Sequence, residues 1–384
     1  MHRSSAAFAV LLCCCAALAL AVKPDERAPV SEKQAPAQIL PGVQPDGSIR
    51  LPNQWSLRPA GKQVTLGDFP VNLAIHPEGA FLAALHAGYG EHEIIVVNLK
   101  TQRITTRTTL NQAWYGLCFS PDGKRLYASG GENEVVHAYD FEEGLLGRRR
   151  DIPVADVEAK FIPAGFALDS TGHTLFVPGT WGDGICIVPL DTPEKRFTIN
   201  LDKQSYPYAC VPTADGKRLF VSLWSKASVA VIDLQEKKVI ATWATEKHPT
   251  EMALSPDGKI LYVACSNSTK VSVVDTAAGK GLETINCALY PSAPSGNTPN
   301  SLSLTPDGQM LFVANADANN VAVFKTAVPG KSQPLGLIPT GWYPTAVRYN
   351  AADKKLYVAN GKGTMSLANP QGPNPLLPRN QTTR

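Results

Sequence analysis

The sequence carries little excess charge of either sign, and this excludes a protein that holds nucleic acid through a basic surface. Its 384 residues include 36 Lys and Arg against 33 Asp and Glu, which gives a formal net charge of +3. Binding to a phosphate backbone requires a basic patch or stripe. The C-x-x-C-H haem motif and paired C-x-x-C motifs are also missing. We therefore expect no nucleic-acid partner and no cofactor.

A disulfide framework is a second missing feature. Three of the eight cysteines are consecutive and lie in an apolar N-terminal segment. The others are an odd number, and each stands in or beside an expected strand: Cys118, Cys186, Cys210, Cys265 and Cys287. An odd set of this kind does not indicate a framework of disulfides. We expect buried free thiols that pack as small apolar side chains.

A long apolar run of the kind that spans a membrane is missing too. The apolar segment 6–21 is short and rich in alanine, follows two basic residues and ends in Ala19-Leu-Ala21, which fits a signal-peptidase site. Residues 1–21 are therefore expected to be a cleavable signal peptide of a secreted or periplasmic protein with no membrane span. A lipid anchor on the three consecutive cysteines is the less favoured alternative. The Pro-rich residues 22–60 are expected to form an extended leader.

The sequence does contain one phrase that recurs seven times: a turn, followed three residues later by a leucine in an apolar strand. The strongest copies read Ser120-Pro-Asp-Gly123, Thr213-Ala-Asp-Gly216, Ser255-Pro-Asp-Gly258 and Thr305-Pro-Asp-Gly308. Copies follow one another about every 45 residues, with several short runs of β-branched and aromatic residues between them. This period predicts an all-β fold, a seven-bladed β-propeller of four-stranded antiparallel blades over residues 61–363.

The two ends of the repeat array determine how the ring closes. Lys62–Leu66 resembles a strand and precedes the first full repeat, so we expect it to be the outermost strand of blade seven. After Leu356–Asn360 the chain soon enters a Pro-rich C-terminal tail, 364–384, in which Thr364–Ala368 is a poor substitute for a third strand. The last blade is therefore expected to be incomplete. It also holds Arg348 at a first-strand position where the other blades hold small or modest residues.

Several phrases resemble a known family of repeat proteins. Leu261-Tyr-Val-Ala264 and Leu356-Tyr-Val-Ala-Asn360 resemble the YVTN-type propeller repeat. Gly67-Asp-Phe-Pro70, His86-Ala-Gly-Tyr-Gly90 and Ala359-Asn-Gly-Lys-Gly363 are more narrowly similar to the N-terminal propeller half of exported proteins whose C-terminal half is an alkaline-phosphatase-like phosphoesterase. The resemblance implies a propeller that works beside a phosphoesterase domain. The metal ligands and the nucleophile of that domain have no counterparts in this sequence.

Aromatic residues are dense in the loops at the end of the propeller where the first strands begin. Loops from separate blades meet at one rim, and exposed aromatic side chains there favour a binding surface. An alternative of equal weight is that they plug the channel mouth and pack between blades. The candidate binding residues are Tyr89, Trp114, Tyr115, Trp181, Tyr206, Tyr208, Trp224, Trp342 and Tyr343.

The evident polar candidates do not assemble into a catalytic set. No Ser-His-acid or paired-carboxylate arrangement can be built, because no acid recurs at positions expected to line the channel. His86 and His92, beside Glu91 and Glu93, are only weak metal candidates, and a solvated polar loop is the favoured interpretation. We therefore assign no catalytic residue and no metal site.

These observations predict an exported binding or scaffold module without catalytic activity of its own. Its expected partner is a protein or small molecule on the loop face, or a phosphoesterase domain. The alternatives are the propeller part of a truncated or split metal-dependent phosphoesterase and a lactonase-like hydrolase. Lactone-hydrolysing propellers share the architecture, but a fold alone does not transfer chemistry.

Overall fold

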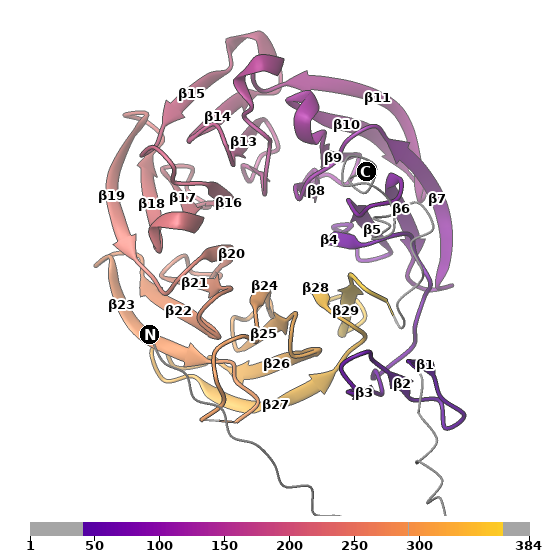
Figure 1. Cartoon of the computed structure of the whole chain (residues 1–384). Helices are drawn as coiled ribbons and strands as arrows, with labels where there is room; N and C mark the ends of the chain where they lie inside the picture. The colour runs from indigo at the N-terminus through magenta and orange to yellow at the C-terminus, as the bar shows by residue number, and fades with distance from the viewer. Residues whose placement is uncertain (1–40, 291, 364–384) are drawn as a thin grey trace, which may run out of the picture. The chain divides into compact units, whose positions relative to one another are not determined.

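Seven small sheets stand around one axis (Figure 1). The computed structural model describes residues 41–290 and 292–363, all within one compact unit. Six of the sheets have four antiparallel strands and the seventh has two. The predicted seven-bladed propeller with an incomplete last blade is confirmed. In these described ranges, no helix is long and apolar enough to cross a membrane.

The blades follow one another along the chain, and within each blade the strands run in sequence from the axis outward (Figure 1). Blades 1 to 3 comprise β4 (Pro70–Ile75), β5 (Phe81–His86), β6 (His92–Asn98), β7 (Arg103–Leu110), β8 (Leu117–Phe119), β9 (Arg125–Ser129), β10 (Val135–Glu142), β11 (Leu145–Pro153), β12 (Ala167–Leu168), β13 (Thr174–Gly179), β14 (Gly184–Pro189) and β15 (Phe197–Asn200). Blades 4 to 6 comprise β16 (Pro207–Pro212), β17 (Arg218–Leu223), β18 (Ser228–Asp233), β19 (Lys238–Ala244), β20 (Pro249–Leu254), β21 (Ile260–Cys265), β22 (Lys270–Asp275), β23 (Lys280–Asn286), β24 (Pro299–Leu304), β25 (Met310–Asn315), β26 (Asn320–Lys325) and β27 (Gln333–Pro339). The short 3-10 helices are η1 (Gly131–Asn133), η2 (Val157–Ala159), η3 (Pro193–Lys195) and η4 (Trp224–Lys226).

The recurring Pro-Asp-Gly phrase forms the hairpin between the first and second strands of a blade. In blade 2, Asp122 Oδ1 accepts hydrogen bonds from Ser120 Oγ at 2.6 Å and from the backbone N–H of Lys124 at 3.0 Å. Gly123 has a φ of +72°, a conformation that glycine adopts without strain. The same two acceptor bonds recur at Asp215, Asp257 and Asp307. The repeated motif that predicts the fold is therefore a local hydrogen-bonded turn, and it determines where each second strand begins.

The hydrophobic core is divided among the interfaces between neighbouring blades. Tyr262 and Val273 of blade 5, for example, pack in one cluster with Leu302 and Val313 of blade 6. Burial of one such large apolar side chain contributes roughly 1.5–3 kcal/mol. Stability therefore comes from each blade packing against the next around the ring.

The end of the propeller where the first strands begin, here called the loop face, has an unusual backbone. In six blades a proline starts the first-strand segment, and the residue before it is left-handed, with φ between +44° and +64°. These residues are Phe69, Ile162, Tyr206, His248, Thr298 and Tyr343. A residue other than glycine in such a region costs on the order of 1–3 kcal/mol, so its surroundings must hold it there. One such constraint is the hydrogen bond from the Trp224 N–H to the Tyr206 carbonyl at 3.1 Å.

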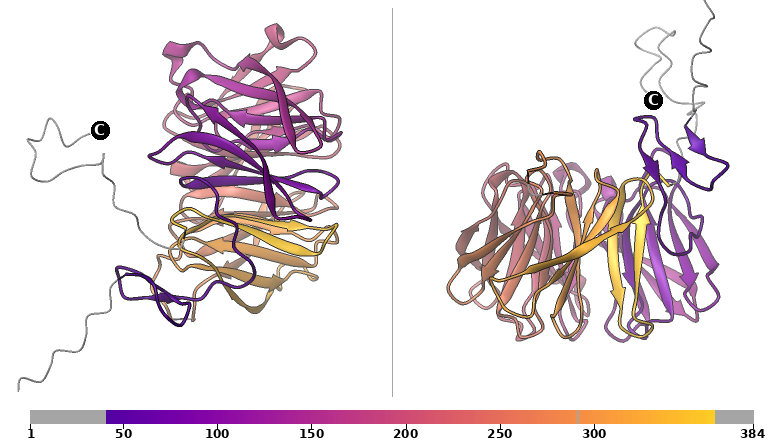
Figure 2. Two further views of the ribbon diagram at one scale, coloured as in Figure 1. Left: turned by 90° about the vertical axis from the view of Figure 1, so that its right-hand side faces the viewer. Right: turned by 90° about the horizontal axis from the view of Figure 1, so that it is seen from below.

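A small sheet precedes the propeller and packs on it. Its strands are β1 (Gly42–Val43), β2 (Ile49–Arg50) and β3 (Ser56–Leu57), drawn in indigo at the rim of the ring in Figure 2. Buried Ile49, Leu51 and Leu57 form a cluster against Trp342 of blade 7. The expectation of an extended leader is wrong for these residues, because three apolar side chains spaced along the segment find a tryptophan to cover them.

Blade 7 consists of β28 (Pro344–Asn350) and β29 (Lys355–Asn360) within the described part of the chain. Lys62–Leu66 forms no strand and joins no sheet, so the expectation that it closes the ring as the outermost strand is wrong. No third strand lies on β29 in the described residues for it to pair with. Leu66 does pack in the apolar cluster that contains Tyr357. Thr364–Ala368 lies outside the described residues.

Candidate functional site in the central channel and on the loop face

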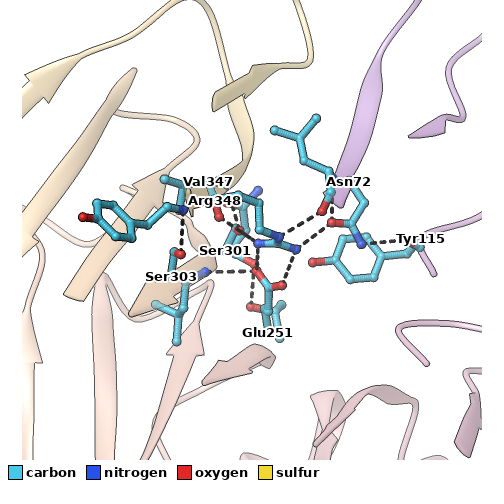
Figure 3. A network of polar contacts seen from close by, with 12 residues as sticks. Asn72, Tyr115, Glu251, Ser301, Ser303, Val347 and Arg348 are labelled. Carbon is cyan, nitrogen blue, oxygen red and sulfur yellow. Dashed lines mark hydrogen bonds and ion pairs between the residues drawn. The ribbon is translucent and has the colours of Figure 1, made fainter. Parts of the chain in front are cut away.

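Arg348 reaches across from blade 7 and joins it to blades 1, 5 and 6 (Figure 3). Its Nη2 donates to Glu251 Oε1 at 2.6 Å and its Nη1 donates to Oε2 at 3.2 Å. The guanidinium also donates to Asn72 Oδ1 at 2.7 Å and to Ser301 Oγ at 3.0 Å. The Arg348 and Glu251 side chains are 19% and 15% exposed, so the ion pair is largely buried. These four residues are called the Arg348 clamp below.

Every polar hydrogen of the Arg348 guanidinium has an acceptor. Nε donates to the Leu73 carbonyl at 2.9 Å and Nη1 also donates to the Val347 carbonyl at 2.8 Å, so all five N–H groups are used. Glu251 Oε2 accepts a further bond from the Leu302 N–H at 3.0 Å. Burial lowers the pKa of Arg348, but the charge of Glu251, its hydrogen bonds to the guanidinium and the nearby Tyr115 together outweigh burial and raise the pKa overall. The clamp is therefore a charged and saturated contact, with no carboxylate free to act as a general base.

The sequence has no acid that recurs at the channel, and the candidate residues predicted from it do not include Glu251, which stands alone on a first strand there. A signal was present in the spacing. Two residues after the starting proline, three blades carry a polar side chain, Asn72, Glu251 or Ser301, and these are the partners of Arg348. The same position is small in other blades: Gly165, Ala209 and Ala346. Arg348 and these three polar residues all depart from the repeat because they form the same hydrogen-bonded cluster.

Two tyrosines lie beside the clamp. The rings of Tyr115 and Tyr208 are 4.9 Å apart, and Asn72 Nδ2 donates to the Tyr115 carbonyl at 2.9 Å. The Tyr115 hydroxyl is buried and has no hydrogen-bond partner among the described residues. Burial first, and then the charge of Glu251, raises the pKa of both tyrosines well above its usual range. Both phenols therefore stay neutral at physiological pH.

A cavity of about 520 Å³ lies among the first strands of blades 1 to 3, with Arg348 in its wall. This volume is within the range of small-molecule pockets. Its lining is mostly apolar, with Ala74, Cys118 and Phe166 among the wall residues, and Glu251 is not part of it. Burial raises the pKa of the Cys118 thiol to about 12, so this thiol is not a thiolate nucleophile at neutral pH. The one carboxylate of the lining, Asp169, accepts hydrogen bonds from Thr171, His173 and Thr174 of its own turn, so the cavity offers mainly apolar contact.

Three of the predicted binding residues are exposed on the loop face. Trp181 is 60%, Tyr89 57% and Trp114 46% exposed. Tyr89 and Trp181 lie in loops between second and third strands, and Trp114 precedes the first strand β8. They come from three consecutive blades, 1, 2 and 3. Large aromatic side chains are thus presented to solvent along one arc of the rim.

The other predicted binding residues are half-buried, apart from the buried Tyr115, and contact their neighbours. The ring of Trp224 lies 4.0 Å from that of His248 and meets Tyr206 edge-on at 6.3 Å, which links blades 4 and 5. Trp342 covers the small sheet. Lys362 Nζ lies 4.4 Å from the centre of the Tyr343 ring. These residues stabilise the loop face, as the alternative interpretation of the aromatic residues expects.

The two candidate metal histidines are engaged with the protein. His86 is fully buried, and its Nε2 accepts a backbone N–H at 3.3 Å. His92 Nδ1 accepts the N–H of Ala113 at 2.9 Å, and Glu93 pairs with Arg107 at 2.9 Å. Burial lowers the pKa of His86, which keeps the ring neutral. Among residues 41–290 and 292–363, no three metal-ligating side chains gather in one place.

The five cysteines of the propeller are free, and four of them are buried. Burial raises the pKa of Cys186 and of Cys265 to about 11 in each case. Their sulfur atoms sit among apolar side chains between blades. The expectation of buried free thiols is confirmed for these positions.

Two family models match parts of the chain. The family described as SMP-30/Gluconolactonase/LRE-like region matches residues 70–225, and the family described as Lactonase, 7-bladed beta-propeller matches residues 193–284. These two matches and the seven observed blades together identify the class of protein to which the chain belongs. The chain is a β-propeller repeat protein. No curated protein sequence matches it.

Solved structures share this fold at low sequence identity. Hydrazine synthase of Kuenenia stuttgartiensis aligns with a TM-score of 0.64 and 19% identity over 78% of this chain and 95% of that chain. A streptogramin B lyase aligns with a TM-score of 0.64 and 15% identity over 78% and 93% of the two chains. Virginiamycin B lyase from Staphylococcus aureus gives 0.61 and 14% over 76% and 92%. At these identities the likeness concerns the fold alone.

Proposed function

We propose that this protein is a binding module that recognises a protein partner through its loop face. The observation that carries the proposal is the exposure of Tyr89, Trp114 and Trp181 on consecutive blades. Exposed aromatic side chains gathered on one face are typical anchors of protein interfaces. Hydrogen bonds hold the loops that present them: the Trp181 N–H donates to the Phe161 carbonyl at 3.2 Å, and the Gly90 N–H donates to Asp68 Oδ2 at 2.7 Å. Little conformational entropy is therefore lost when a partner binds.

The channel favours a structural role over a catalytic one. Glu251 is the acid of the clamp, and both its oxygens are occupied by Arg348 and a backbone N–H. A general base must be able to accept a proton from a substrate within hydrogen-bond reach. In this arrangement the carboxylate would first have to leave its guanidinium partner.

The proposal includes the setting of the protein. Similarity to the propeller half of exported phosphoesterase proteins supports a periplasmic or secreted location and makes a phosphoesterase domain a fitting partner. The basic start, apolar core and Ala19-Leu-Ala21 site support a mature chain that begins at Val22. Mass spectrometry of protein recovered from the periplasm or the medium tests this, and an intact Met1 there would contradict it.

The binding proposal is tested with a double variant, Trp114→Ala with Trp181→Ala. Wild-type and variant chains are immobilised and exposed to the periplasmic fraction of the source cells, and captured proteins are quantified by mass spectrometry. The two tryptophans are expected to act as contact anchors, so at least one protein captured by the wild type should fall at least about tenfold in the variant. Both side chains are exposed, so the melting temperature should not change.

The matched control lies on the opposite face. Lys124 and Lys217 are exposed residues of the turns between first and second strands, and their double alanine variant should capture the same proteins as the wild type. Equal capture by the tryptophan variant and the wild type would contradict the proposal.

Lactone hydrolysis is the second candidate function. It is favoured by the two lactonase-related family matches over 70–225 and 193–284 and by the 520 Å³ cavity among the first strands. Acid release from a panel of aliphatic and aromatic lactones measures it directly. Phe166→Trp places a larger side chain in the cavity wall. Turnover by the wild type that this variant abolishes would support the candidate, and a wild-type rate equal to the uncatalysed rate would dismiss it.

A further inference from the structure

The outer edge of β29 is an open sheet edge with an unusual amount of exposed surface. In the other six blades the second strand is buried almost throughout, because a third strand and both neighbouring blades cover it. In β29 only Ala359 is buried, while Leu356, Tyr357 and Val358 are partly exposed. An apolar edge strand with unpaired backbone groups is a site for the addition of another strand.

The turn that would start a third strand is already formed. In five blades the residue directly before the third strand is left-handed: Glu134, Asp183, Ala227, Thr269 and Asn319, with φ between +46° and +60°. In blade 7 the residue in that conformation is Gly363, with φ +61°. Its N–H bonds the Asn360 carbonyl at 3.1 Å. Gly363 lies three residues after β29, whereas the left-handed residue lies four residues after the second strand in blades 3 to 6, so the loop of blade 7 is one residue shorter. A third strand is therefore expected to begin at residue 364.

The residues that follow fit the pattern of a third strand in this register. Third strands of four blades are apolar at positions two and four and small at position three: β14, β18, β22 and β26. The segment Thr364-Met-Ser-Leu-Ala-Asn369 has Met and Leu at positions two and four and Ser at position three. Its sixth residue, Asn369, matches Asp233 and Asp275, whose side chains accept the backbone N–H groups of the next turn.

We propose that Thr364–Asn369 of the same chain adds to β29 as the antiparallel third strand of blade 7. Thr364 then pairs with Asn360, and Met365 and Leu367 cover the partly exposed side chains of β29. The occupant is the chain's own segment because only the loop Gly361–Gly363 separates it from the edge, which makes its effective concentration there very high.

The tail supplies one strand and no more. Four residues after the end of the third strand, other blades use a left-handed residue to turn into the fourth strand, as at Gln102, Lys237 and Gly279. The corresponding residue here is Pro373, whose ring fixes φ near −65°.

Hydrogen exchange of the full-length chain tests the proposal. With Thr364–Asn369 in place, amides of β29 should exchange within about tenfold of the rate of β25 in the complete blade 6. Leu367→Asp places a charge at a position that becomes buried, and should speed exchange of β29 at least about tenfold. Gln371→Asp introduces the same charge in the same tail beyond the strand, and should leave exchange unchanged.

Two results would overturn the proposal. The first is that, in the wild-type protein, the amides of β29 exchange as fast as those of surface loops. This measurement does not depend on whether the Leu367→Asp variant folds. The other is equal exchange in the Leu367→Asp and Gln371→Asp variants. Light scattering identifies the donor: a monomer is expected, and a dimer that Leu367→Asp dissociates would assign the strand to a second copy and refute the assignment to the same chain.

Discussion

Removing the Arg348 side chain from the clamp is predicted to be among the most damaging single changes in the channel. Arg348→Met keeps most of the side-chain volume and removes the guanidinium. Glu251 then remains 15% exposed without a counter-charge, and Asn72 Oδ1 and Ser301 Oγ lose a donor. Breaking a buried ion pair on one side costs roughly 3–5 kcal/mol, chiefly because the surviving charge stays desolvated.

The expected value lies near the lower end of that range, about 3 kcal/mol, because the channel leaves both side chains slightly exposed. Urea unfolding followed by tryptophan fluorescence measures it. At a denaturant slope of about 3 kcal/mol per molar, the midpoint should fall by roughly 1 M. The double variant Arg348→Met with Glu251→Leu removes both charges together. It should recover to within about 1 kcal/mol of the wild type, because no unpaired charge remains.

An exposed ion pair provides the control. Lys238 and Glu236 are 2.6 Å apart, but their side chains are 63% and 57% exposed, so Lys238→Met should leave the midpoint unchanged. The reasoning is refuted if Arg348→Met shifts the midpoint no more than Lys238→Met does. It is also refuted if the double variant is as unstable as the single one, because the loss would then come from packing and not from the unpaired carboxylate.

Three further predictions follow from burial. The melting temperature should fall as pH drops below about 6.5, because burial lowers the pKa of His86 and of His137 in the folded chain. Below that pH the two histidines bind protons in the unfolded chain more readily than in the folded chain, which favours unfolding. An unchanged dependence of the melting temperature on pH in His86→Gln would contradict this account. Trp342→Ala should expose the small sheet, so trypsin should cleave after Arg50 faster than in the wild type; equal cleavage rates would mean that the tryptophan does not hold the sheet. Cys118 and the other propeller cysteines should resist iodoacetamide until the chain unfolds, and rapid labelling of the native protein would show that the blades open.

The sequence predicts the blades well because each is a local unit. The Ser-Pro-Asp-Gly123 turn and the leucine that follows it depend on contacts within a few residues, and the same contacts recur around the ring. The last blade stands out for the same reason, since the chain becomes rich in proline from Pro370 onward and no longer follows the repeat.

The clamp and the small sheet depend on contacts between residues that are far apart in the chain. Spacing marks the irregular polar positions of the clamp, but it does not show which of them meet. Arg348 meets Glu251, 97 residues earlier in the chain, and Asn72, 276 residues earlier. Nothing local indicates that blades 1 and 5 lie within reach of blade 7, because that follows only from the closure of the ring. Trp342 is likewise an aromatic loop residue in the sequence, and only the folded chain shows that the small sheet covers it.

Lactone hydrolysis by the purified full-length chain is the measurement that tests the central claim most directly, namely that the loop face carries the function and the clamp occupies the channel. Acid release from a lactone panel is followed for the wild type and for Glu251→Gln, which keeps an acceptor oxygen toward Arg348 and removes the carboxylate. The account predicts the buffer rate for both proteins. Turnover by the wild type above the buffer rate would contradict it, and the loss of that turnover in Glu251→Gln would show that Glu251 acts on substrate in the channel.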